Sequence, residues 1–296
     1  MTAPKPVDTI ATMSDAPTPM STADWAGDSA RRWALHADRL EAQLEPVSDV
    51  LFAAARLAPG MQVLDVGCGR GATTRRAAAS VGPTGSVLGV DVAESLIAEA
   101  RVRCDISNVT WIRADAQRHE FIAEYDALIS RFGVMFFDDA VAAFANLRRA
   151  ALPGACLTMI TWQPRDRSEF FEVPLRLGRQ IAEQIGLSVA VDELPVDGGP
   201  FSFGVPDHVR RVLGKAGWGS VDIELQSIDL YNGGPGTCAV AAEVSLAIGP
   251  LRATLEHATA EQRSEVGRRL ATAFEPYHDG TGVRLEGAIA VVRASA

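Results

Sequence analysis

VLDVGCGRG, residues 63–71, joins a short apolar segment to a turn that holds three glycines. We predict a strand over 61–66 and a helix over 72–80, so that strand, glycine turn and helix follow in order. The glycines remove side chains where the backbone must turn sharply, and a ligand can therefore lie against the amides that begin the helix. This stretch predicts a ligand-binding turn at the end of a buried strand.

The alternation of strand and helix continues after this turn. We expect strands at 87–90, 109–113, 125–130 and 155–162 with helices at 94–104 and 139–151, and later strands at 221–231 and 283–292. Strands separated by helices of this length form a parallel sheet with helices on both faces. The predicted fold class is α/β, a Rossmann-like doubly wound, mostly parallel seven-stranded sheet with an inserted helical lid and an N-terminal helical cover.

We divide the chain into four regions. Residues 1–24 are expected to be a mobile tail, and 25–162 hold two cover helices, at 29–44 and 46–57, together with the ligand-binding half of the sheet. Residues 163–206 contain a helix at 168–185 and a loop rich in Gly and Pro, which favours a lid over the site. Residues 207–296, with a helix at 206–216 and a helical excursion at 238–274, complete the domain.

Composition excludes several classes of protein. The 296 residues carry 28 Lys and Arg against 37 Asp and Glu, a net charge of −9, which disfavours binding to nucleic acid or to an anionic membrane. The longest apolar runs are well short of the roughly 20 residues that cross a bilayer. The four cysteines show no CxxC spacing, so neither a zinc site nor a disulfide framework is expected. We therefore expect a cytoplasmic protein without a metal site.

A carboxylate at the end of the second strand narrows the ligand class. Asp91 follows Gly67 by 24 residues, where an acid can accept both hydroxyls of a ribose. The pattern Gly67-x-Gly69-x-x-Ala72 also matches the dinucleotide fingerprint, so two adenosine cofactor classes fit. Asp65, two residues before the first glycine, would repel a pyrophosphate and favour a ligand that carries an ammonium and a sulfonium.

Residues 63–71 resemble the first motif of the class I S-adenosylmethionine-dependent methyltransferases. The segments 88–92, 113–116, 129–132 and 152–155 are similar to the later motifs of that family. The resemblance covers about residues 59–162 and implies S-adenosyl-L-methionine as cofactor and S-adenosyl-L-homocysteine as product. The residues that it implies for cofactor binding are Asp65, Gly67, Gly69, Asp91 at the ribose, Val92 at the adenine, Asp115 and Ala116 at the adenine amino edge, and Ser130 at the methionine portion.

Within the family the chain is most similar to enzymes that methylate small molecules, including those of secondary metabolism. Trp33, in the first cover helix, is expected to cover the cofactor, and the Phe-rich segment 132–137 to shape the acceptor pocket. No Asn/Asp-Pro-Pro-Tyr run follows the fourth strand and no Pro-Cys pair occurs, which moves the expectation away from nucleic-acid methylation. The implied partner is a small-molecule acceptor.

Methyl transfer is an in-line displacement at an activated carbon, so the protein need mainly align acceptor and donor. If the acceptor must lose a proton, His36 is the candidate base, three residues after Trp33. Two alternatives remain open: an NAD(P)-dependent oxidoreductase, and a non-catalytic module that binds S-adenosylmethionine. The sequence determines neither the methylated atom nor the oligomeric state.

Overall fold

The computed structural model describes residues 25, 27–187 and 199–296. The expected tail, 1–24, and the loop 188–198 of the expected lid lie outside the described residues. None of the helices in the described part of the chain has the length and apolar character that crossing a membrane requires.

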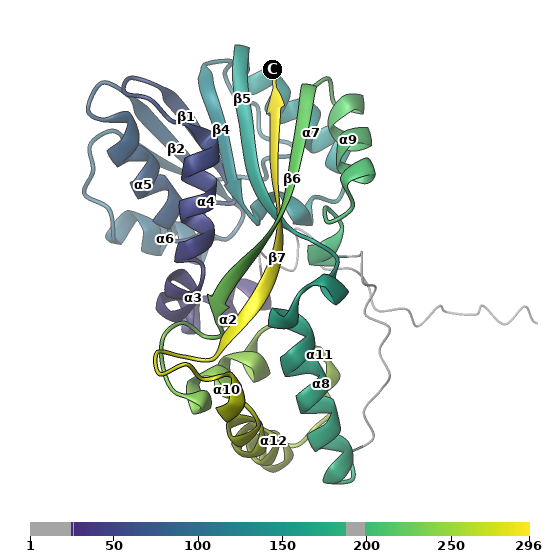
Figure 1. The fold of residues 1–296 in the computed structure, drawn as a ribbon. Coiled ribbons are helices and arrows are strands. Elements are labelled where there is room, and N and C mark those ends of the chain that lie inside the picture. Colours follow the sequence, from purple (N-terminus) through teal and green to yellow (C-terminus); the bar gives the residue numbers. More distant parts are fainter. Residues whose placement is uncertain (1–24, 26, 188–198) are drawn as a thin grey trace, which may run out of the picture.

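A seven-stranded sheet with the strand order β3-β2-β1-β4-β5-β7-β6 forms the centre of the upper half of the molecule (Figure 1). β7 is antiparallel to both of its neighbours, and the other pairings within β1–β5 are parallel, which confirms the predicted fold class. The strands are β1 Gln62–Val66, β2 Ser86–Asp91, β3 Val109–Arg113, β4 Tyr125–Arg131, β5 Ala151–Trp162, β6 Gly219–Tyr231 and β7 Arg284–Ser295.

The chain order reverses next to β1. β1 pairs with β2 on one side and with β4 on the other, so the segments that leave β1 and β4 diverge at their carboxyl ends. Such a switch point is where open α/β sheets bind their ligands. The glycine turn follows β1 directly and therefore lies in this crevice.

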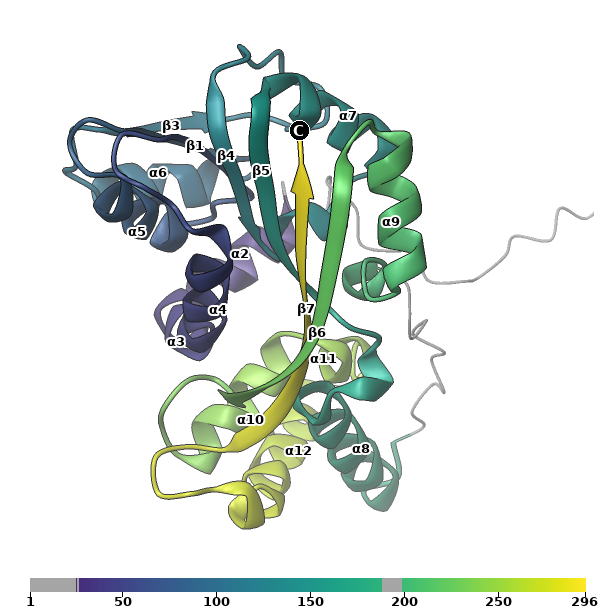
Figure 2. The same ribbon diagram turned by 45° about the horizontal axis from the view of Figure 1, so that its top comes forward.

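Helices cover both faces of the sheet (Figure 2). α4 (Glu45–Ala55) packs on β4, β5, β7 and β6, while α5 (Ala72–Val81) and α6 (Glu94–Val102) lie along β1–β3. α7 (Ala140–Ala150) and α9 (Pro206–Lys215) pack against each other beside β5 and β6. Asp139 caps α7 by accepting a hydrogen bond from the Ala142 amide at 3.0 Å, which fixes where that helix begins.

The predicted cover helix at 29–44 is wrong as one continuous helix. It is divided into α2 (Asp28–Leu35) and α3 (Ala37–Gln43), which meet at His36. The His36 amide bonds to the Trp33 carbonyl at 3.2 Å, a tighter turn that changes the helix direction. The apolar periodicity survives the break, because one residue outside the helix hardly alters the spacing, and the sequence therefore did not reveal it.

A separate helical lobe lies below the sheet (Figures 1 and 2). It consists of α8 (Glu169–Gln184), α10 (Cys238–Ala247), α11 (Pro250–Thr254) and α12 (Ala260–Ala273). α8 comes from the segment after β5 and the other three from the segment between β6 and β7, yet α8 contacts both α11 and α12. Gly178 permits this packing, since a Cβ there would come within 2.4 Å of Leu251. β6 and β7 extend from the sheet into the lobe.

Candidate active site

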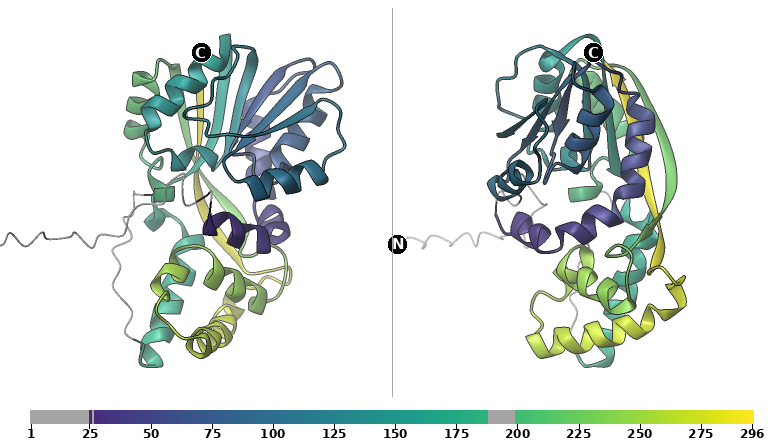
Figure 3. Two further views of the ribbon diagram at one scale, coloured as in Figure 1. Left: turned by 180° about the vertical axis from the view of Figure 1, so that it is seen from behind. Right: turned by 90° about the vertical axis from the view of Figure 1, so that its left-hand side faces the viewer.

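A cavity of about 590 Å³ lies between the carboxyl ends of the strands, the cover helices and the helical lobe. Its upper part is formed by the glycine turn and the ends of β2 and β3, and its lower part by aromatic side chains and the lobe. From behind, α2 and α3 lie between the sheet and the lobe (Figure 3). The cavity is therefore large enough for a nucleoside cofactor beside a second small molecule.

The glycine turn requires its glycines for two different reasons. A Cβ on Gly67, at φ +70, would come within 2.5 Å of the Gly133 Cα, and one on Gly71 within 2.1 Å of the Trp111 ring. At Gly69, also at positive φ, no atom lies within 4 Å of the Cβ position. Gly67 and Gly71 are thus fixed by packing, whereas Gly69 leaves open space on the cavity wall.

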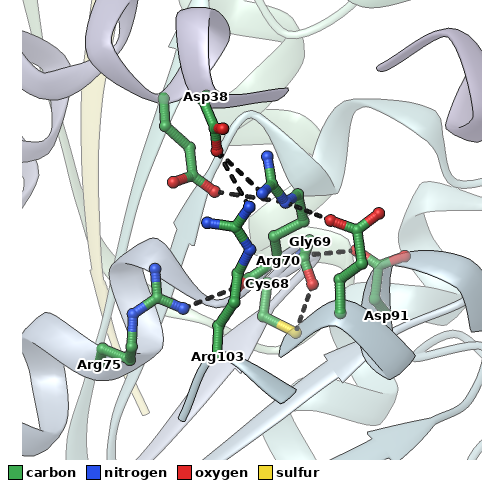
Figure 4. A network of polar contacts seen from close by, with 9 residues as sticks. Asp38, Cys68, Gly69, Arg70, Arg75, Asp91 and Arg103 are labelled. Atoms are coloured by element: carbon green, nitrogen blue, oxygen red, sulfur yellow. Dashed lines mark hydrogen bonds and ion pairs between the residues drawn. The ribbon is translucent and has the colours of Figure 1, made fainter. Parts of the chain in front are cut away.

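Asp91 at the end of β2 is held by backbone donors. Its Oδ2 accepts the Gly69 amide at 2.9 Å and its Oδ1 accepts the Ala93 amide at 2.9 Å (Figure 4). Burial raises the pKa of this carboxyl, and the backbone hydrogen bonds act against that rise. Each oxygen retains a further lone pair, and Asp91 lines the cavity, so it can still accept two hydroxyl groups.

Asp65 in β1 is fully buried behind the glycine turn and is not among the lining residues of the cavity. Its Oδ2 accepts the hydroxyls of Thr73 and Thr74, both at 2.6 Å, whereas its Oδ1 has no hydrogen-bond partner in the described protein. Burial raises the pKa of Asp65 to about 6, with the threonine hydrogen bonds and the charge of Arg131 acting in the opposite direction. At neutral pH the carboxyl is mostly ionised and places negative charge directly behind the turn.

The ends of β2 and β3 form the wall opposite the cover helices. Val92, Asp115 and Ala116 all line the cavity there. The Asp115 Oδ1 accepts the Gln117 amide at 2.9 Å, which fixes the carboxylate at the beginning of the loop after β3. An apolar side chain, a carboxylate and a backbone amide in this order can bind the face and the edge of a planar base.

The lower part of the cavity is aromatic. Phe132 stacks on Trp162 with the ring centroids 4.1 Å apart, and Trp162 stacks in turn on Phe170 at 5.9 Å. On the cover side Trp25 lies edge-on to Trp33 at 5.6 Å and to Phe136 at 5.1 Å. These rings form an apolar surface that faces the polar half of the same cavity.

Comparison with known proteins identifies the part of the chain that builds this site. A family model described as a methyltransferase domain matches residues 63–154, which hold the glycine turn, Asp91, Asp115 and the start of β5. Residues 63–154 form a class I methyltransferase domain.

Relatives and structures extend the likeness beyond this segment. An uncharacterized protein of Mycobacterium tuberculosis is 36% identical over 135 residues, 44% of this chain and 48% of the relative. Nocamycin O-methyltransferase of Saccharothrix syringae is 31% identical over 182 residues, 57% of this chain and 65% of the relative. The chain thus spans about half to two thirds of the length of these curated relatives.

The structure of phosphoethanolamine N-methyltransferase 2 of Haemonchus contortus matches this chain with a TM-score of 0.55 at 15% identity. The match covers 93% of this chain and 60% of the Haemonchus protein. At this identity the likeness concerns the fold alone.

Besides Asp65, two predicted site residues lie outside the lining of the cavity. Ser130 is fully buried and donates its hydroxyl to the Val66 carbonyl at 2.8 Å, so it ties β4 to the end of β1. His36 lies at the break between α2 and α3, outside the lining, with its Nδ1 3.9 Å from a carboxylate oxygen of Glu243. This position does not support a catalytic role for His36.

The described lining of the cavity contains no histidine, and the described residues contain no group of three or more His, Cys, Asp or Glu that could hold a metal ion. Trp33, Gly67, Gly69, Asp91, Val92, Asp115 and Ala116, by contrast, are all brought together on its wall.

Arg131 is a lining residue that the sequence did not point out. Its Nη1 donates to the Ser48 hydroxyl at 2.6 Å and lies 3.4 Å from the Leu44 carbonyl, so α4 positions the guanidinium beside the turn. Burial lowers the pKa of Arg131, and the charge of Asp65 acts against that shift. The arginine partly balances the buried carboxylate. Only the resemblance of its segment, 129–132, to a family motif offered a signal in the sequence.

Arg70 of the glycine turn links the cover helix α3 to the methyltransferase domain (Figure 4). Its side chain is only 3% exposed, and its Nη2 lies 2.9 Å from a carboxylate oxygen of Asp38 in α3. Its Nε lies 2.7 Å from an oxygen of Glu99 in α6, and Arg103 also reaches Asp38 at 3.1 Å. One buried guanidinium thus links α3, α6 and the cofactor turn.

Proposed function

We propose that this chain transfers the methyl group of S-adenosyl-L-methionine to a small-molecule acceptor and releases S-adenosyl-L-homocysteine. The observation that carries the proposal is the division of one cavity into two chemically different halves. One half presents the glycine turn with Asp91 and Asp115, and the other half is aromatic and apolar. Such a cavity provides adjoining places for a polar nucleoside and for an organic acceptor.

The residues present fit the cofactor. Asp91 retains the lone pairs that two ribose hydroxyls need, and the Cβ position of Gly69 is open. Val92, Asp115 and Ala116 would bind the adenine, with Trp33 closing the site from the cover side. The unsatisfied Oδ1 of Asp65 and its negative charge favour a cationic amino-acid portion and disfavour the pyrophosphate of NAD(P).

When bound, the cofactor supplies a methyl group on positively charged sulfur. The contribution of the chain is then mainly to position the acceptor in line with that methyl group. An aromatic ring of the lining such as Phe132 can stabilise positive charge through the face that does not stack on Trp162. The Arg70 network holds the cover closed over the site. No side chain of the described lining is required as a base.

The acceptor class follows from the apolar half of the cavity and from the relatives. Two relatives are described as methyltransferases of organic compounds. One is nocamycin O-methyltransferase, and the other is an aklanonic acid methyltransferase of Streptomyces sp. (strain C5), which is 40% identical over 91 residues. We therefore propose a natural-product or related organic acceptor.

The net charge of −9 argues against nucleic acid as a partner. The four free cysteines are those of a reducing compartment, and we propose a cytoplasmic location on that ground.

Two experiments test this function. Calorimetric titration of the purified chain with S-adenosylhomocysteine, NAD and NADP separates the methyltransferase from an oxidoreductase, and tight binding of either dinucleotide would refute the proposal. Methyl-labelled cofactor is then incubated with a panel of phenols, amines, carboxylic acids and keto acids. Binding without transfer to any acceptor would instead favour a non-catalytic module, because a fold by itself does not establish chemistry.

A further inference from the structure

Two arginines on the cavity wall lack the acidic partners that the others have. Arg70 pairs with Asp38 and Glu99, and Arg131 lies against Ser48 near Asp65. The side chain of Arg32 in α2 bonds only to the Ser29 hydroxyl, at 3.0 Å, and the side chain of Arg252 in α11 has no hydrogen bond or ion pair, both counted within the described residues. Both side chains are half-buried.

The positive charges of Arg32 and Arg252 repel each other. Burial lowers the pKa of Arg252, and the charge of Arg32 lowers it further. Glu256, which also lines the cavity, acts in the opposite direction, whereas Arg263 adds to the repulsion. The charges that act on Arg252 are thus those of two cations and one carboxylate. Like charges held together in a partly desolvated place are unfavourable unless an anion joins them.

A further donor in the same lining lacks an acceptor. The indole Nε1 of Trp25 is buried and has no hydrogen-bond partner in the described protein. Buried indole N–H groups are normally paired. The cavity lining thus contains a buried donor without an acceptor in addition to the two arginine side chains.

We propose that Arg32 and Arg252 together bind a carboxylate of the acceptor, whose planar apolar body lies against Phe132, Trp162 and Phe171. This inference rests on the proposed function and names the substrate class, an aromatic or polycyclic carboxylic acid. The arginines belong to the cover and to the lobe, so an anion between them also draws these two parts together over the site. A planar guanidinium fork matches a carboxylate in two parallel hydrogen bonds.

The cofactor is a second source of the same chemistry, because its methionine portion carries a carboxylate. The location of the pair favours the acceptor. Arg252 lies on α11 in the helical lobe, whereas the glycine turn and the strand ends that would bind the cofactor lie on the sheet side of α2 (Figure 3). The experiment has one arm for each source.

The probes are 2-naphthoate, anthracene-2-carboxylate and anthraquinone-2-carboxylate, each paired with its neutral primary amide. Binding to the full chain is measured by calorimetry with and without saturating S-adenosylhomocysteine, for wild type, Arg32→Gln, Arg252→Gln and the double variant. Arg210→Gln, at an exposed position of α9, is the matched control. We expect at least one acid to bind wild type about 10-fold or more tightly than its amide, and the double variant to lose that preference.

Equal affinity of acids and amides, absence of binding by all three acids, or an unchanged preference in the double variant would overturn the inference. In the second arm, S-adenosylhomocysteine is compared with 5′-methylthioadenosine, which lacks the amino-acid portion. If the arginine variants weaken only the former, the cofactor carboxylate is the ligand and the acceptor assignment is wrong. Failure of wild type to bind S-adenosylhomocysteine would refute the proposed function alone, since the acid and amide titrations without it still test the arginine pair.

Discussion

Replacing Asp65 by Asn should stabilise the chain relative to wild type, and this difference should grow as the pH rises. The variant also removes the carboxylate behind the glycine turn. The side chain is fully buried, and its folded pKa of about 6 lies above the ordinary value of 3.8. Between those values the folded chain binds more protons than the unfolded chain, so the Asp65 contribution to stability decreases as pH rises from about 4 to about 6. At 1.36 kcal/mol for each unit of pKa, the full decrease is about 3 kcal/mol.

Asparagine keeps one oxygen, which can still accept both threonine hydroxyls, and it carries no charge. Its amide would stand where Oδ1 lacks a partner, and that cost does not depend on pH. The unfolding free energy of Asp65→Asn minus that of wild type should therefore become more positive by about 2 kcal/mol between pH 4 and pH 7.

Urea denaturation of both proteins across this pH range measures the difference, and groups common to both cancel. Asp105→Asn, at an exposed position, is the control. A difference that stays constant with pH would refute the reasoning. The same variant should weaken binding of the sulfonium S-adenosylmethionine more than binding of neutral-sulfur S-adenosylhomocysteine, because both carry an ammonium but only the former adds a positive sulfur to it. Equal losses for both ligands would remove Asp65 from cofactor selection.

Four further substitutions test the site. Asp91→Ala should weaken S-adenosylhomocysteine by about 1 to 3 kcal/mol in calorimetry, because two hydroxyls lose their acceptor; unchanged affinity would reject the ribose role. Gly67→Ala should destabilise the fold by about 1 to 3 kcal/mol in urea, since its Cβ would come within 2.5 Å of the Gly133 Cα. Gly69→Ala should cost only about 1 kcal/mol of stability yet reduce cofactor affinity, and the opposite order would contradict the packing argument. Arg70→Gln should increase hydrogen exchange in α3, because it removes the links to Asp38 and Glu99, and equal protection would show that the cover is held by other contacts.

The strands, the glycine turn and the carboxylates at the strand ends could be predicted from the sequence because each depends on local requirements. A buried strand reads as an apolar run, and a positive φ at Gly67 or Gly69 admits few residues other than glycine. Asp91 and Asp115 follow their strands directly, so a parallel sheet necessarily brings them to one edge. These are the residues that the structure places on the cavity wall.

The break at His36, the joining of α8 to α10–α12 and the stack of Phe132, Trp162 and Phe170 depend on contacts between segments far apart in the chain. Periodicity carries no information about such contacts, because an apolar helix face can bury itself against any apolar partner. The same holds for Arg131 and Arg252, whose importance lies in what surrounds them. In this chain, local backbone and charge patterns determined where a nucleoside can bind, and only the packing of distant helices decided what closes the site and which charges remain without a partner inside it.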